Sequence, residues 1–150
     1  MNGMIRKAGP LSAVQTVFPL GYDSRRHPRF VLIGGGYTIQ GERDDGWLDV
    51  FRPAIQINIR DVSISGVGML CKTKLTVGSH LIIFSPSGAP IRVVIVRSLP
   101  DPLFPKLFRV GCRWCGFPRG KVFSEWLQFI DEAQLPLFQE EITILSKMSL

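Results

Sequence analysis

The stretch Ile55-Gln56-Ile57-Asn58-Ile59-Arg60 and the residues that follow it, Asp61-Val62-Ser63-Ile64-Ser65-Gly66, decide the fold class of this chain. Apolar and polar side chains alternate over residues 55–60, which is the pattern of a β-strand with one buried face. Strict alternation would put Asp61 on the same face as Ile59, so the strand either bulges or ends at Arg60. Asp and Ser at a strand end commonly bind local backbone amides. The stretch therefore predicts a half-buried strand followed by a polar turn at the protein surface.

Similar strand-like segments lie on both sides of this stretch, separated by residues typical of turns. They span residues 30–33 and 37–40, which form one strand interrupted at Gly34-Gly35-Gly36 or two strands, and then 47–51, 67–71, 80–84, 91–97 and 107–114. A parallel sheet would need crossover helices, and the intervals between the segments are too short for them. We therefore expect a mainly β fold, built as an antiparallel barrel or sandwich.

The spacing of apolar residues becomes helical in the last part of the chain. Over residues 122–130 it predicts one amphipathic helix packed on the barrel. Pro136 then opens a second helical stretch that runs to about Met148. We expect three parts: an N-terminal arm over residues 1–21, a barrel with its packed helix over 22–131, and a C-terminal helical extension over 132–150.

The composition excludes several classes of protein. The 150 residues are 45% hydrophobic and 20% charged, which fits one globular domain and excludes disorder for most of the chain. The longest apolar runs are far shorter than the ~18 residues needed to cross a bilayer, so we expect no membrane span. Three cysteines make a poor disulfide framework, and no hydrophobic signal sequence precedes the strands. These features predict a reduced, cytoplasmic protein.

Charge is distributed unevenly along the chain. Residues 1–120 carry 16 of the 18 Lys and Arg and 7 of the 12 Asp and Glu, a net charge of +9, whereas residues 121–150 have a net charge of −3. A basic body favours an anionic partner, but net charge alone does not distinguish nucleic acid, acidic lipid, nucleotide and acidic protein. The choice among these partners depends on the motifs.

The first motif is the R-x-x-x-R spacing of Arg25 and Arg29, just ahead of the first strand-like segment. A chain with this many arginines contains roughly one such pair by chance. Pro28 disfavours a helix here, and four extended residues span ~13–14 Å, so the two guanidinium groups can grip separate parts of one ligand. Arg26, which lies between them, is an additional candidate contact.

The second motif is D-x-S-x-x-G, formed by Asp61, Ser63 and Gly66. A match of this kind is expected by chance in roughly one of twenty chains of this composition, so it is more specific than the arginine pair. The alternative is a turn whose Asp and Ser side chains bind only local backbone amides. Glycine at the last position admits a positive φ or a close approach of the backbone.

In this order, the two motifs resemble those of the PilZ domain family, bacterial receptor modules for the second messenger cyclic di-GMP. The resemblance covers about residues 22–130. Four parts of the chain depart from the family pattern: the glycine-rich run, the long connection over residues 41–53, the residues ahead of the arginine motif and the C-terminal tail. It implies a six-stranded antiparallel β-barrel of the PilZ type, here with one or two C-terminal α-helices. The resemblance also assigns the ligand contacts to residues of the two motifs, with guanine and phosphate held by the arginines: Arg25, Arg29, Asp61, Ser63 and Gly66.

The residue types of both motifs suit this ligand chemically. Guanine presents two acceptors, O6 and N7, that a guanidinium group meets with two parallel hydrogen bonds, and arginine can also lie on the face of the base. The other edge of guanine donates hydrogen bonds, and a carboxylate such as Asp61 is a fitting acceptor. The Ser63 hydroxyl and the backbone at Gly66 can serve phosphate or base.

Other features of the sequence give little support for catalysis or metal binding. Cys112 and Cys115 form a C-x-x-C pattern, but residues three apart in a strand face opposite sides, so the thiols diverge. His27 and His80 are widely spaced, and neither accompanies a Ser or Cys nucleophile motif. The triple glycine lacks the register of a phosphate-binding loop. We expect no catalytic residue, no metal and no cofactor other than the ligand.

The sequence is best interpreted as a non-enzymatic receptor that binds cyclic di-GMP between the arginine arm and the D-x-S-x-x-G turn. The ligand would order the arm and so change what a protein partner contacts. Two alternatives stay open: an interaction adaptor that keeps the barrel without using the ligand, and a nucleic-acid-binding barrel. The second is less favoured, because aromatic residues such as Phe84, Phe108 and Phe129 fall at core positions rather than on a stacking surface. The oligomeric state and the identity of the partner stay open.

Overall fold

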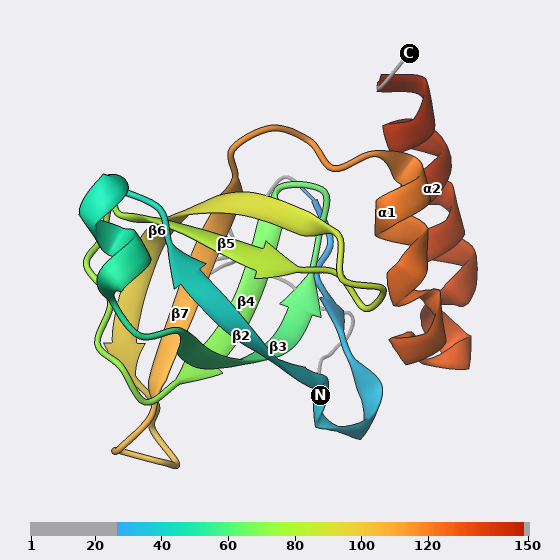
Figure 1. Ribbon diagram of the computed structural model, residues 1–150. Coiled ribbons are helices and arrows are strands. Elements are labelled where there is room, and N and C mark those ends of the chain that lie inside the picture. Colours follow the sequence, from blue (N-terminus) through green and yellow to red (C-terminus); the bar gives the residue numbers. More distant parts are fainter. Residues whose placement is uncertain (1–26, 149–150) are drawn as a thin grey trace.

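The structure is a computed structural model that describes residues 27–148, and Figure 1 shows them as a barrel of strands with two helices packed at one side. The strands are β1 (Phe30–Val31), β2 (Tyr37–Arg43), β3 (Ile55–Val62), β4 (Gly66–Cys71), β5 (His80–Phe84), β6 (Pro90–Pro100) and β7 (Phe108–Trp114). The α-helices are α1 (Gly120–Phe123) and α2 (Leu135–Met148). The 3-10 segments are η1 (Ile33–Gly35), η2 (Trp47–Phe51), η3 (Ser124–Phe129) and η4 (Glu132–Gln134).

The strands close into an antiparallel barrel. They pair in the order β3-β2-β5-β6-β7-β4, and β4 pairs with β3 to complete the ring. β1 and β2 lie along the same edge of β3, so they act as two pieces of one barrel strand. Between them the chain turns at Gly34, Gly35 and Gly36, whose φ angles are 68°, 78° and 76°, a region that favours glycine. The predicted six-stranded antiparallel barrel with C-terminal helical structure is confirmed, and the segments around the triple glycine are two strands.

A bulge in β3 settles the position of Asp61. The pairing of β3 with β4 shifts register between Ile59 and Asp61, so the strand continues through Val62 instead of ending at Arg60. Ile59 and Val62 are buried in the barrel, whereas Arg60 and Asp61 are half-exposed. The extra residue therefore turns Asp61 to the outer face of the barrel, where alternation alone would have put it inside.

The core extends from the barrel interior to the C-terminal helices. The Phe123 ring stacks on Phe138 of α2 with centroids 4.7 Å apart, and Phe138 meets the edge of Phe30 in β1 at 4.9 Å. Trp126 Nε1 donates a hydrogen bond to Tyr37 Oη at 2.9 Å. Burying each of these large side chains stabilises the fold by roughly 1.5–3 kcal/mol. The helices therefore hold the start of the barrel at β1.

Two predicted elements differ from the structure. Residues 47–51, expected as a short strand, form η2. The amides of Asp49 and Arg52 bind the carbonyls of Gly46 and Asp49 in tight turns, and no strand of the described residues pairs with them. The expected single helix over 122–130 is α-helical only to Phe123 and continues as η3, a tighter winding that keeps Trp126 buried. The second helical stretch is confirmed as α2, in which Phe138 and Leu145 are buried and Leu137 is exposed.

Within residues 27–148, none of the helices has the length and apolar character needed to cross a membrane.

Candidate functional site

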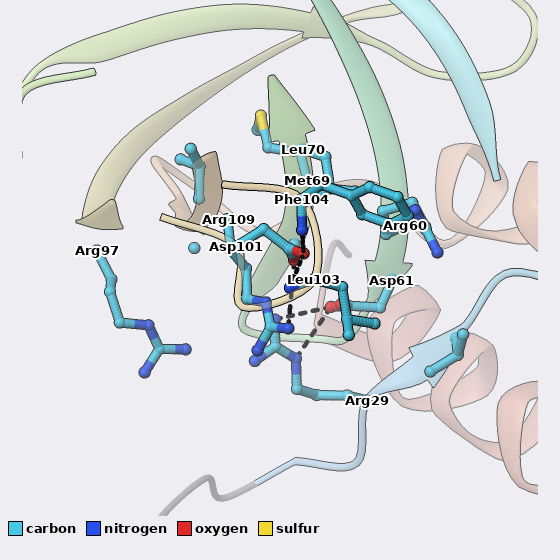
Figure 2. A pocket seen from close by; sticks show the side chains of 14 residues that line it. Arg29, Arg60, Asp61, Met69, Leu70, Arg97, Asp101, Leu103, Phe104 and Arg109 are labelled. Atoms are coloured by element: carbon cyan, nitrogen blue, oxygen red, sulfur yellow. Dashed lines mark hydrogen bonds and ion pairs between the residues drawn. The ribbon is translucent and has the colours of Figure 1, made fainter. Parts of the chain in front are cut away.

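A pocket of about 420 Å³ opens on the outer face of the barrel. Its walls come from the start of β1, the end of β3, the middle of β4, the end of β6, the start of β7 and the loop that joins β6 to β7. Figure 2 shows the guanidinium groups of Arg29 and Arg109 beside the carboxylates of Asp61 and Asp101, with Arg97 apart from them at one side. The pocket therefore collects charged groups that lie far apart in the sequence.

Arg29 and Asp61 form an ion pair at this pocket. Arg29 Nε donates a hydrogen bond to Asp61 Oδ1 at 2.9 Å, and Nη2 lies 2.7 Å from the same oxygen. The pairing of β1 with β3 brings them together, because Val31 lies opposite Asp61. Both side chains are 22% exposed, so the pair is partly withdrawn from water and still open to a ligand. One residue of each sequence motif thus reaches the same site.

Gly68 makes room for this ion pair. A Cβ atom at Gly68 would overlap the carboxylate of Asp61 and lie 2.7 Å from Nη2 of Arg29. The sequence placed this glycine two residues after the second motif but gave no reason to include it in the site. Its role becomes visible only when β4 pairs with β3, which sets Gly68 opposite Asp61.

Ser63 lies in the turn between β3 and β4 and Gly66 is the first residue of β4; neither lines the pocket. The Ser63 hydroxyl accepts hydrogen bonds from the amides of Ser65 and Gly66, both at 3.2 Å. Ser63 is only 4% exposed, so the expectation that it lies at the surface is wrong: its carbonyl also accepts a bond from the Trp114 indole, which covers the turn. At Gly66, a Cβ atom would overlap the carbonyl of Cys112 in β7. The assignment of ligand contacts to Ser63 and Gly66 stays a prediction.

Arg25 and Arg26 lie outside the described residues, as does the arm predicted over residues 1–21. Of the R-x-x-x-R motif, only Arg29 is placed by the structure.

Three further arginines line the pocket, and sequence reasoning did not select them. Arg109, at the start of β7, lies 3.3 Å from Oδ1 of Asp101. Arg60 and Arg97 also line it, and neither has an ion-pair partner within residues 27–148. The sequence did contain a second R-x-x-x-R pair, Arg109 and Arg113, but a pair inside a strand resembled ordinary surface charge. Four arginines and two aspartates line the pocket, which gives it a net charge of +2.

Asp101 shapes the loop over the pocket. Its Oδ2 accepts hydrogen bonds from the amides of Leu103 and Phe104 at 3.0 and 2.9 Å. Burial by itself would raise the pKa of Asp101, but these two amides and the Arg109 guanidinium outweigh it and hold the pKa below its ordinary value of 3.8. Asp101 is therefore ionised at neutral pH and fixes the loop beside Arg109.

The described residues offer little for catalysis or metal binding. Within residues 27–148, no cluster of three His, Cys, Asp or Glu side chains is arranged to hold a metal ion. Cys112 is buried, and this burial raises its thiol pKa to about 12, while Cys115 is exposed. A thiol with so high a pKa is protonated at neutral pH and is a poor nucleophile. The net positive charge of the pocket suits an anion.

A solved structure shows a distant likeness. It is described as a PilZ domain with c-di-GMP of YcgR from Escherichia coli. The alignment covers 85% of this chain and 95% of the other chain, at 13% sequence identity and a TM-score of 0.43. No protein-family model and no curated protein matches the chain.

Proposed function

We propose that this protein is a receptor for cyclic di-GMP that binds the dinucleotide in the pocket beside Arg29 and Asp61. The observation that carries the proposal is the ion pair itself: the last arginine of R-x-x-x-R and the aspartate of D-x-S-x-x-G meet at one open, cationic pocket. The motifs were recognised separately in the sequence. Their meeting at one pocket is what a shared ligand requires.

Charge and hydrogen-bonding capacity support the choice of ligand. Cyclic di-GMP is a dianion with two phosphodiester groups, and the pocket carries a net charge of +2. Guanidinium groups suit both phosphate and the acceptor edge of guanine. Both contacts of Arg29 go to Oδ1 of Asp61, and no bond to Oδ2 is recorded among the described residues, so Oδ2 is available to accept from the donor edge of guanine.

Signalling in this proposal runs through the segment around the R-x-x-x-R motif, residues 20–29. Arg25 would join Arg29 on the bound ligand, so residues ahead of β1 would be held against the barrel only when the ligand is present. Ordering them costs roughly 1–2 kcal/mol per residue, which the ligand contacts must offset. A protein partner that contacts the closed arm would then report the ligand.

Calorimetry with cyclic di-GMP tests the proposal. We expect the wild-type protein to bind in the micromolar range or tighter, a standard free energy of roughly 8 kcal/mol or more. Arg29→Ala and Asp61→Ala should each weaken binding by roughly tenfold or more, because each removes a charged contact. Arg119→Ala, at an exposed arginine outside the pocket lining, is the matched control and should bind like wild type.

The alternatives predict different results. No saturable heat at high micromolar cyclic di-GMP would refute the receptor and favour the adaptor that keeps the barrel without the ligand. A nucleic-acid-binding barrel would instead bind polynucleotide with an affinity that falls steeply and linearly on a logarithmic plot against salt, whereas a single dianion gives a shallower dependence.

A further inference from the structure

Four residues form one row across the outer face of the barrel beneath the pocket. Asp61 in β3 lies opposite Gly68 in β4, Gly68 lies opposite Gly111 in β7, and Gly111 lies opposite Arg97 in β6. All four residues line the pocket. The row thus begins with a carboxylate, ends with a guanidinium and has two glycines between them.

Two bulges turn the charged ends of this row outward. Arg97 follows a register shift between β6 and β7 after Ile95, just as Asp61 follows the shift after Ile59. Ile59 and Ile95 are buried in the barrel, and without the extra residue each charged side chain would share their inward face. Bulges commonly re-aim a side chain beside a functional site. Here one bulge lies at each end of the same row, before Asp61 and before Arg97.

The two glycines form a floor that has no side chains of its own, and the charged side chains at the ends of the row lie over it. The Arg29–Asp61 pair lies against Gly68, and the Arg97 side chain lies against Gly111, with Nη2 and Nε at 3.7 and 3.8 Å from the position of a Cβ atom. Three steps between neighbouring strands separate Asp61 from Arg97, roughly 14 Å between their backbones. Figure 2 shows the two residues on opposite sides of the pocket. The Arg29–Asp61 pair fills the face of Gly68, so a flat ring can lie over Gly111 once the Arg97 side chain moves aside, with one edge toward each charged end.

The two ends offer complementary hydrogen-bonding groups. Arg97 has no hydrogen bond or ion pair recorded within residues 27–148, and it is exposed, so its guanidinium is free to take up a ligand. Arg109 is instead engaged with Asp101, and Nε of Arg60 is buried. Guanine carries its acceptors, O6 and N7, on one edge and its donors on another. The row presents a donor at Arg97 and an acceptor at Asp61.

We infer that the Gly68–Gly111 floor is the base-binding surface of the pocket and that Arg97 is the residue that selects guanine, by binding O6 and N7. This inference rests on the proposed function. Arg97 swings from Gly111 to the edge of the base, which lies over Gly111 with its donor edge toward Asp61 beside Gly68.

Two variants and one ligand analogue test the inference by calorimetry. Arg97→Ala removes the selecting group, with Arg119→Ala as the control. Gly111→Ala places a methyl group on the floor, where it meets Arg97 only at ordinary van der Waals distances, so the fold tolerates it. Gly46→Ala, at an extended glycine with open space around it, is its control. The analogue is cyclic di-GMP in which N7 of both guanines is replaced by C–H.

We expect Arg97→Ala and Gly111→Ala each to lower the affinity for cyclic di-GMP roughly 10- to 100-fold, with both controls at the wild-type value. The wild type should lose affinity for the analogue, and Arg97→Ala should bind analogue and parent equally. If both variants bind cyclic di-GMP with wild-type affinity while Asp61→Ala loses binding, the proposed base-binding floor is refuted and the proposed receptor function is not. If the wild type and Arg97→Ala lose the same fraction of their affinity on going from cyclic di-GMP to the analogue, the contact between Arg97 and guanine is refuted. A wild type that does not bind cyclic di-GMP overturns both proposals.

Discussion

Replacing Ser63 by alanine should destabilise the barrel. The Ser63 hydroxyl accepts hydrogen bonds from the amides of Ser65 and Gly66, and Gly66 is buried. The substitution leaves a buried donor without this partner, at a cost of about 1–3 kcal/mol in the free energy of unfolding. With a urea dependence of roughly 2 kcal/mol per molar, the midpoint of urea unfolding should fall by ~0.5–1.5 M. The turn would then be a structural support of the site.

Ser65→Ala is the matched control, because Ser65 lies in the same turn and is exposed; it removes the bond between the Ser63 and Ser65 hydroxyls but keeps both amide bonds to Ser63. We expect it to change the free energy of unfolding by less than ~0.5 kcal/mol. Equal urea midpoints for the wild type and Ser63→Ala would refute the reasoning, since the buried amide would then have found another partner. Calorimetry on the folded variant adds a second result: weaker binding of cyclic di-GMP supports the ligand contact assigned to Ser63, and wild-type binding limits this residue to shaping the turn.

Two further predictions concern the arm and the loop over the pocket. Trypsin should cleave after Arg25 or Arg26 more slowly when cyclic di-GMP is saturating, and Arg29→Ala should remove most of this protection; equal cleavage with and without bound ligand would exclude the arm as the switch. The depressed pKa of Asp101 contributes stability that is fully present above its ordinary value of 3.8 and is lost as pH falls through the lowered value. Asp101→Asn should therefore flatten the decline of the urea midpoint in acid, and an identical decline in both proteins would contradict this assignment.

The strands of the barrel could be predicted from the sequence because their alternation is local. The run at residues 55–60 shows its buried face directly, and the glycines and prolines between segments mark the turns. Residues 47–51 resembled a strand because they form a short, mostly apolar run ahead of Pro53. A strand also needs a partner, and local sequence does not show whether one is available. Pairing between distant segments is therefore what the sequence could not supply.

The candidate site likewise combines residues that the local motifs predicted with residues that only the pairing of distant strands explains. The motif pattern led to Arg29 and Asp61, although alternation alone would have put Asp61 inside the barrel and only the bulge turns it outward. Arg97 gave no signal, because its outward position depends on a bulge set by the pairing of β6 with β7. The place of Gly111 in the pocket likewise becomes visible only when β6 pairs with β7, which sets Arg97 opposite it. Ser63 was expected at the surface, and the distant Trp114 is what buries it.

The contact between Phe30 and Phe138 has a consequence for regulation. Phe30 is the next residue after Arg29, so α2 holds the backbone from which Arg29 projects. If the ligand binds better when Arg29 is held in place, thermodynamic linkage is reciprocal, and the bound ligand must strengthen the packing of α2 by the same free energy. A partner that competes for the apolar face of α2 would then release the ligand, and the ligand would oppose that partner. The C-terminal helix would thus act as a second input to the receptor, antagonistic to the first.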